Sequence, residues 1–222
     1  MRVRTAQNRD DPMNSGAARS RPARITKYTH SCVRLERDGT VLVIDPGIWS
    51  EPSALYDADA VLVTHEHGDH IDVLRLAGLG APVYAPADAR ITGLDVTGVK
   101  SGESFTAAGF AVTAVGTRHA PVFQDQPDCT NHGYIIEDRL YHPGDALFVP
   151  DQPVETLLVP LHASWLKTAE AISFLRAVRP ERAFGIHEAQ INSRGLQAAN
   201  NWLTDQGMHR YRYLVPGESS DL

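Results

Sequence analysis

The chain has 222 residues, 42% of them hydrophobic, and a formal net charge of −6. This length supports one domain with a substantial core and is too short for two full enzymatic domains. No run of 18 apolar residues occurs, and the N-terminus lacks the hydrophobic centre of a secretory signal. We therefore expect a cytoplasmic protein without a membrane span, in which Cys32 and Cys129 are both reduced.

The first 24 residues differ in composition from the rest. They contain six Arg, no Lys and two acidic residues, without hydrophobic periodicity. Such a segment cannot bury enough apolar surface to fold, so Met1–Arg24 is expected to be a disordered tail, or an overlong start with Met13 as another initiator. Removing six of 21 basic and two of 27 acidic residues leaves 15 and 25, a net charge of −10. This acidic body disfavours a nucleic-acid substrate.

From Ile25 the pattern predicts strands. Cys32–Arg37 alternates apolar and polar residues, Asp38-Gly39 is a hairpin signal, and Thr40–Ile44 returns as an apolar strand. The strand ends in Asp45-Pro46-Gly47. Two interpretations stay open for Asp45: an ordinary turn residue, or a carboxylate that orients a metal-bound imidazole.

A cluster of metal-binding side chains follows the next apolar segment. The four residues before His65 are apolar or β-branched, which is typical of a buried strand. His65 and His67 point to the same side of an extended segment and can bind one ion. Gly68 then lets the backbone turn and brings round a second pair, Asp69 and His70. Imidazole nitrogens and carboxylate oxygens suit zinc and similar metals, so we predict a metal site here and not a solvated loop.

The following residues predict a third nitrogen ligand. A helix, a strand and a helical turn are expected at Ile71–Leu76, Pro82–Ala85 and Asp88–Ile91. Ser104–Thr117 reads as two strands around Ala108-Gly109, and the second leads into His119 and Pro121. A His at a strand end before a Pro-containing loop repeats the first motif. With His65 and His67, His119 completes a three-imidazole set known from catalytic zinc sites.

The second half alternates strands and helices. The expected elements are hairpin strands at Gly133–Glu137 and Leu140–His142, a strand at Val154–Leu161, a helix at Thr168–Val178 capped by Thr168, a strand at Ala183–Ile186, a helix at Ser193–Gln206 and an extended segment at Tyr211–Pro216. Asp145 follows the hairpin in a Pro-Gly-Asp sequence that locally indicates only a turn. His162 and His187 both follow apolar strands, so local sequence does not separate their roles.

The His-x-His-x-Asp-His signature, led in by an apolar strand and a Thr, resembles that of the metallo-β-lactamase-fold hydrolases. Within them, the pattern from about Ile25 onward is similar to small metal-dependent hydrolases that include L-ascorbate-6-phosphate lactonase-like proteins. The resemblance implies a single α+β domain over residues 25–222. Its architecture is a four-layer αβ/βα sandwich with a metal site at one edge, between the two sheets.

The resemblance also implies residue roles. The ligands of one ion are His65, His67 and His119, those of the other are Asp69, His70 and His187, and Asp145 bridges the two. Asp69 is also assigned to catalysis. His187 is preferred over His162 because in the family the ligand strand comes after the helix. His30, His162 and Trp165 are expected substrate contacts.

The expected reaction is hydrolysis of a small ester, lactone or phosphoester. Two divalent ions about 3.5–4 Å apart, zinc first and manganese or iron as alternatives, activate a shared water that attacks carbon or phosphorus. A nucleic-acid phosphodiesterase shares this chemistry but conflicts with the acidic body. A mononuclear-iron oxidoreductase of the persulfide dioxygenase type has a similar His/Asp set. A non-enzymatic scaffold is least expected because no ligand position is missing, and the sequence does not indicate an oligomeric state.

Overall fold

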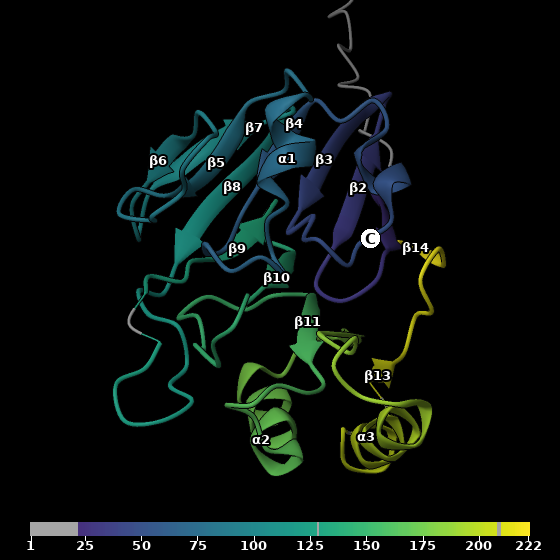
Figure 1. The fold of residues 1–222 in the computed structure, drawn as a ribbon. Coiled ribbons are helices and arrows are strands. Elements are labelled where there is room, and N and C mark those ends of the chain that lie inside the picture. The colour runs from purple at the N-terminus through teal and green to yellow at the C-terminus, as the bar shows by residue number, and fades with distance from the viewer. Residues whose placement is uncertain (1–21, 128, 208–209) are drawn as a thin grey trace, which may run out of the picture.

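Two mixed β-sheets form the centre of the protein (Figure 1). The computed structural model describes residues 22–127, 129–207 and 210–222, and each sheet has seven strands there. The first sheet has the order β14-β1-β2-β3-β4-β5-β6, at Ser219–Asp221, Arg24–Lys27, Val33–Arg37, Thr40–Ile44, Ala60–Leu62, Val83–Pro86 and Thr97–Val99. The second has the order β13-β12-β11-β10-β9-β8-β7, at Tyr211–Arg212, Arg182–Ile186, Thr156–Pro160, Leu140–His142, Gly133–Ile136, Phe110–Val115 and Ser104–Ala107.

Helices cover the outer faces of both sheets. The described residues contain the short 3-10 helix η1 and the helices α1, α2 and α3, at Pro52–Leu55, Val73–Ala77, Thr168–Val178 and Ser193–Gln206. α1 packs on the first sheet, and α2 and α3 lie next to each other on the second (Figure 1). The predicted αβ/βα sandwich is therefore confirmed. No helix in these residues is long and apolar enough to cross a bilayer.

Strand β3 is apolar because both of its faces are buried. Leu42 and Ile44 point into the core between the sheets, whereas Val41 and Val43 join the cluster that contains Leu76 of α1. Successive side chains of a strand point to opposite faces, so a strand covered on both faces is apolar throughout. Fully burying each of these side chains contributes about 1.5–3 kcal/mol.

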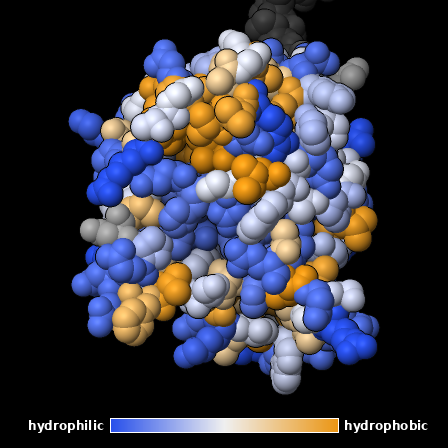
Figure 2. All heavy atoms as spheres, viewed as in Figure 1, coloured by the Kyte–Doolittle hydropathy of each residue, from blue (hydrophilic) through white to orange (hydrophobic). Residues whose placement is uncertain are grey.

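The cover that α1 gives to the first sheet is narrow. Figure 2 shows hydrophobic atoms gathered on the surface around α1. Within this helix Leu76 is buried, but Leu74 is 89% exposed. The outer side of α1 thus remains apolar and in contact with solvent.

Most of the predicted elements are present. Asp38 and Gly39 join β2 to β3 with φ angles of 52° and 85°, as a two-residue hairpin loop requires. The prediction is wrong at Asp88–Ile91, which forms no helix, and it omits β6 and β14, which are short edge strands of small and polar residues. Thr168 is the first residue of α2 and not its cap.

The start of the folded body also differs from the prediction. Strand β1 begins at Arg24, and Ala23 is buried in the core between the sheets. The body therefore begins before Ile25. The rest of the predicted tail, residues 1–21, lies outside the described residues.

Candidate metal centre

The carboxyl ends of several strands meet at one edge of the sandwich. β1, β3 and β4 run in one direction in the first sheet, and β8, β10, β11 and β12 run in one direction in the second. Each of these strands delivers functional side chains just after it ends. They are His30 after β1, Asp45 after β3, His65, His67, Asp69 and His70 after β4, His119 after β8, Asp145 after β10, His162 and Trp165 after β11, and His187 after β12.

Three overlapping groups of these side chains could hold a metal ion. Within each group the donor atoms lie within 4.8 Å of one another. The groups are His30, Asp69, His70 and His187; His65, His67 and His119; and His65, His70 and Asp145. The fold thus brings together every ligand predicted from the sequence. It also adds the ring of His30, whereas the side chain of His162 belongs to none of the groups.

Asp145 lies between the groups. Its Oδ1 is 3.1 Å from Nε2 of His70 and 3.0 Å from Nε2 of His187, and its Oδ2 is 3.3 Å from Nε2 of His119. The indole N–H of Trp165 donates to Oδ2 at 3.0 Å. Burial alone would raise the pKa of Asp145, but the neighbouring His70 and His187 lower it well below its ordinary value. The carboxylate therefore stays ionised.

Asp45 orients His70. Its Oδ2 lies 2.7 Å from Nδ1 of His70 and accepts the hydroxyl of Thr64 at 2.7 Å, and its Oδ1 accepts the N–H of Thr64 at 2.8 Å. The hydroxyl oxygen of Thr64 can in turn accept the Nδ1–H of His65 at 3.1 Å. Of the two interpretations that the sequence leaves open for Asp45, the structure supports the orienting carboxylate.

Two further histidines have their Nδ1 atoms fixed by main-chain carbonyls. Nδ1 of His187 lies 2.5 Å from the carbonyl oxygen of His162, and Nδ1 of His119 lies 2.6 Å from that of Ala120. A carbonyl only accepts, so both Nδ1 atoms donate, and in the neutral rings each Nε2 atom has the lone pair. These lone pairs face Asp145.

The donor chemistry fits a cation at the centre. Nε2 of His65 lies 3.0 Å from Nδ1 of His67, so two more ring nitrogens meet there. Nε2 of His70 and Oδ1 of Asp145 are buried and make no hydrogen bond, although they face each other. When the proton of His70 is on Nδ1, two lone pairs point at each other, and a positive ion between them relieves the repulsion.

The pKa shifts of the cluster also indicate a site for a cation. Burial would lower the pKa of His70, but the carboxylates of Asp145 and Asp45 raise it well above its ordinary value. Burial, together with His70, lowers the pKa of His65 well below its ordinary value. Without a metal the cluster therefore binds a proton at His70 and keeps His65 neutral. A metal ion can take the place of that positive charge.

The chain matches the family model described as the beta-lactamase superfamily domain over residues 24–187. The chain belongs to this superfamily. Protein Rv0786c of Mycobacterium tuberculosis is 40% identical to it in an alignment of 186 residues that covers 78% of this chain and 88% of that protein. A UPF0173 metal-dependent hydrolase of Thermus thermophilus is 31% identical in an alignment of 183 residues that covers 71% of this chain and 80% of that protein.

A solved structure shares the superfamily fold. Igni18, a metallo hydrolase from Ignicoccus hospitalis, has a TM-score of 0.71 at 21% identity and covers 91% of this chain and 99% of its own. The superfamily predicted from the histidine signature is thus confirmed, and the chain is a metal-dependent hydrolase of this superfamily. The finer resemblance to L-ascorbate-6-phosphate lactonase-like proteins stays a prediction.

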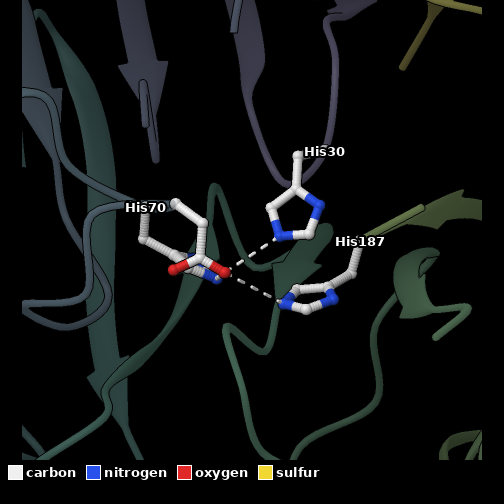
Figure 3. A group of neighbouring side chains, drawn as sticks. His30, His70 and His187 are labelled. Carbon is white, nitrogen blue, oxygen red and sulfur yellow. Dashed lines mark hydrogen bonds and ion pairs between the residues drawn. The ribbon is translucent and has the colours of Figure 1, made fainter. Parts of the chain in front are cut away.

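The three predicted substrate contacts, His30, His162 and Trp165, occupy different positions around the metal cluster. His30 is buried, and Figure 3 shows its ring beside those of His70 and His187. His162 is half-buried, and its main chain orients His187. Trp165 lies over the cluster with its ring centroid 6.2 Å from that of His187.

Other residues of the site were not singled out by the sequence. Trp49 has its ring centroid 4.9 Å from that of His30 and is 41% exposed beside the exposed Ile48. Thr64 connects Asp45 to His65, as described above. In the sequence these residues differ from ordinary loop residues only by their position next to predicted ligands or turns. That position alone is a weak basis for predicting a role in the site.

Proposed function

We propose that the chain hydrolyses a small ester or lactone with two divalent metal ions held by this cluster. The observation that carries the proposal is the position of the Asp145 carboxylate between two sets of imidazole nitrogens. In the proposal one ion takes His65, His67 and His119, the other takes Asp69, His70 and His187, and Asp145 bridges them. Bound ions supply a nucleophile from water at neutral pH and polarise the group under attack. The nitrogen and oxygen donors suit zinc, with manganese or iron as alternatives.

Asp69 is the proposed catalytic carboxylate. Burial would raise its pKa, but the hydrogen bond from His30 and the charge of His70 lower it to about 2, so it is ionised at neutral pH. Its side chain is 17% exposed, compared with 5% for Asp145. An ionised carboxylate on the open side of the centre can accept a hydrogen bond from the attacking water and orient it.

Exposed and half-buried apolar side chains beside the site support an uncharged substrate. Trp49 and Ile48 line the side next to His30, and Trp165 lies on the side of His119 and His187. Indole rings favour apolar or planar groups, and the body outside the tail carries an excess of acidic residues. Both features favour an ester or lactone over a phosphoester or nucleic acid. His162 and Trp165 are the proposed substrate contacts. From composition alone, we also propose a cytoplasmic enzyme without a membrane partner.

Metal analysis combined with a substrate panel tests this function. Protein purified without added metal is analysed for Zn, Mn and Fe and assayed on an aryl ester, a lactone, a thioester and an aryl phosphodiester. We expect about two ions per chain and turnover of the ester or lactone that chelators abolish and Zn or Mn restores. His65→Ala should lose most of the metal and nearly all turnover, because two nitrogens hold an ion much more weakly than three.

Other results would change the assignment. Preference for the phosphodiester would favour the nuclease alternative, and salt-dependent binding of RNA would support it. One iron per chain with oxygen consumption would favour the oxidoreductase. Full metal content and normal turnover in His65→Ala would show that the cluster is not the active centre.

A further inference from the structure

A buried ion pair lies next to the metal cluster. Lys27, the last residue of β1, is 1% exposed, and Glu188, which follows His187, is 6% exposed. Nζ of Lys27 donates to Oε1 of Glu188 at 3.0 Å, to the carbonyl of His30 at 2.7 Å and to the carbonyl of Tyr28. A buried ammonium group is tolerated only when it is paired and hydrogen-bonded, and these acceptors use its three N–H groups.

This pair fixes the backbone of two histidines of the site. His30 and His187 have φ angles of 68° and 63°, a region that is costly for residues with a side chain. Oε1 of Glu188 accepts the backbone N–H of His30 at 2.9 Å, and the backbone N–H of His187 donates to the carbonyl of His30 at 3.1 Å. Lys27 binds that same carbonyl. The network therefore holds both histidines in place from behind.

The ring of His30 satisfies both of its nitrogens in only one neutral tautomer. The backbone N–H of Ala189 donates to Nδ1 at 3.2 Å, so Nδ1 carries a lone pair. In neutral imidazole the proton is then on Nε2, which lies 3.2 Å from Oδ2 of Asp69 (Figure 3). A metal-bound Nε2 would need its proton on Nδ1, directed at the N–H of Ala189.

The neighbouring ligand candidates have the opposite arrangement. The acceptors beside His70 and His187 hold a proton on Nδ1, so in the neutral ring that metal binding requires, Nε2 is the nitrogen with the lone pair. His30 belongs to the same group by distance but differs in the position of its proton. Distance alone therefore does not make it a ligand.

We infer that His30 is a positioning residue that donates a hydrogen bond to Asp69, and is neither a metal ligand nor a substrate contact. The Lys27–Glu188 pair keeps it in that position. The inference rests on the proposed metal centre, because Asp69 is one of its proposed ligands. The bond occupies one lone pair of Oδ2 and restricts rotation of the carboxylate, which directs the remaining lone pairs at the ion shared with His70. Loss of such a bond typically weakens metal binding about 10–100-fold.

Nuclear magnetic resonance of the full chain, labelled with 15N-histidine and loaded with 113Cd, tests the proton position directly. The His30 signals are assigned by their loss in His30→Gln. We expect a proton on Nε2 of His30 and no cadmium coupling there, whereas Nε2 of His70 and His187 should couple to cadmium. Coupling at His30, or a proton on its Nδ1, overturns the inference. The position of the His30 proton can also be measured in the metal-free protein. The inference about His30 can therefore be tested separately from the proposed metal centre.

Two variants of His30 test the role of the donor. His30→Gln keeps a side-chain N–H of similar reach, and His30→Asn suits the left-handed backbone but is too short to reach Asp69. Affinity for the more weakly bound ion is measured by competition with a chromophoric chelator, and thermal unfolding checks that both variants fold. His30→Asn should bind that ion about 10–100-fold more weakly, and His30→Gln should regain most of the loss. Equal loss in both variants, or no loss in either, contradicts the role.

A second pair of variants tests the support behind His30. Lys27→Met leaves the Glu188 carboxylate buried without its partner, whereas Lys27→Met combined with Glu188→Gln removes both charges. The single variant should melt at a lower temperature and lose affinity for the same ion. The double variant should regain both, because the amide oxygen of Gln can still accept the N–H of His30. Unchanged affinity in the single variant, or no recovery in the double variant, contradicts the support.

Discussion

At the scale of single residues, the partner of one ring nitrogen decides what the other nitrogen can do. In their neutral forms, His70 and His187 have an acceptor at Nδ1 and present the lone pair of Nε2, whereas His30 has a donor at Nδ1 and presents an N–H. These partners come from distant parts of the chain. The sequence identifies the ligand histidines by their spacing but not their tautomers, because Asp45 and Ala189 reach them only in the folded protein.

His187 and His162 form a matched pair for testing the second ion. The bond that orients His187 comes from the main-chain carbonyl of His162, so it survives removal of the His162 side chain. His187→Ala should release about one metal equivalent and lower kcat by orders of magnitude, and His162→Ala should keep both ions and change mainly KM. Elemental analysis with steady-state kinetics gives both values. A metal equivalent lost from His162→Ala alone would reverse the roles.

His30 should make the stability of the metal-free protein depend on pH. Burial is the main cause that lowers its pKa from 6.5 to about 4. Between these values the unfolded chain binds a proton that the folded protein does not bind, so the free energy of unfolding falls as the pH falls. Urea unfolding at several pH values should show this loss, and His30→Gln should show less of it. Parallel curves for the two proteins would contradict the assignment.

At the scale of elements, the loops after β3 and β4 must pass very close to each other. A Cβ atom at Gly47 would lie 1.9 Å from the carbonyl oxygen of Asp69. At Gly68, inside the histidine motif, the nearest side-chain atom is 3.8 Å away, on Ile48. The sequence draws attention to Gly68 as the turn residue, but the requirement for glycine is at Gly47. It arises from a contact between loops that local sequence does not reveal.

Alanine at these two positions should therefore have different effects. Gly47→Ala should push the β3 loop away from Asp69, weaken the ion that Asp69 is proposed to bind and lower turnover at least tenfold, since small misplacements of catalytic groups are costly. Gly68→Ala should retain metal and turnover. Metal titration and kinetics of both variants check this. Normal activity in Gly47→Ala would show that the loops separate without moving the carboxylate.

Elements with strong periodicity were predicted better than short edge strands. The bounds of α2 and α3 agree with the prediction because apolar residues recur on one face of each helix. Strand β6 contains Gly98, and β14 is Ser219–Asp221, so neither has the alternation that marks a strand. They are ordered by pairing with β5 and β1, which is a tertiary effect.

At the scale of the whole molecule, the first described residues belong to the first sheet. Arg24 pairs with Glu36 and with Asp221, and the carbonyl of Ala23 accepts the N–H of Leu222 at 2.7 Å. Deleting residues 1–21 should leave the melting temperature unchanged, as their composition suggests. Deleting residues 1–24 should lower it by several degrees, because β1 loses its first residue and its link to Leu222. Equal melting temperatures for the two deletions would contradict this.

The four-layer architecture was predicted from the resemblance, and the order of the strands within each sheet was not predicted. Hairpins such as β2–β3 follow from turn residues, but nothing near Arg24 indicates that its strand pairs with Ser219–Asp221. The metal site was predictable because its histidines are metal-binding residues that occur at a characteristic spacing. The ion pair between Lys27 and Glu188 was not predictable, because a single Lys in a strand and a single Glu after a ligand have no spacing that indicates a pair.

The pairing of β14 with β1 has a consequence for synthesis on the ribosome. Arg24 and Ser219, which are in contact in the folded protein, are 195 residues apart, so β1 leaves the ribosome long before its outer neighbour β14 is made. Until then the outer edge of β1 can pair with other chains. A nascent or prematurely terminated chain that lacks residues 219–222 is thus expected to aggregate, although its metal ligands are complete.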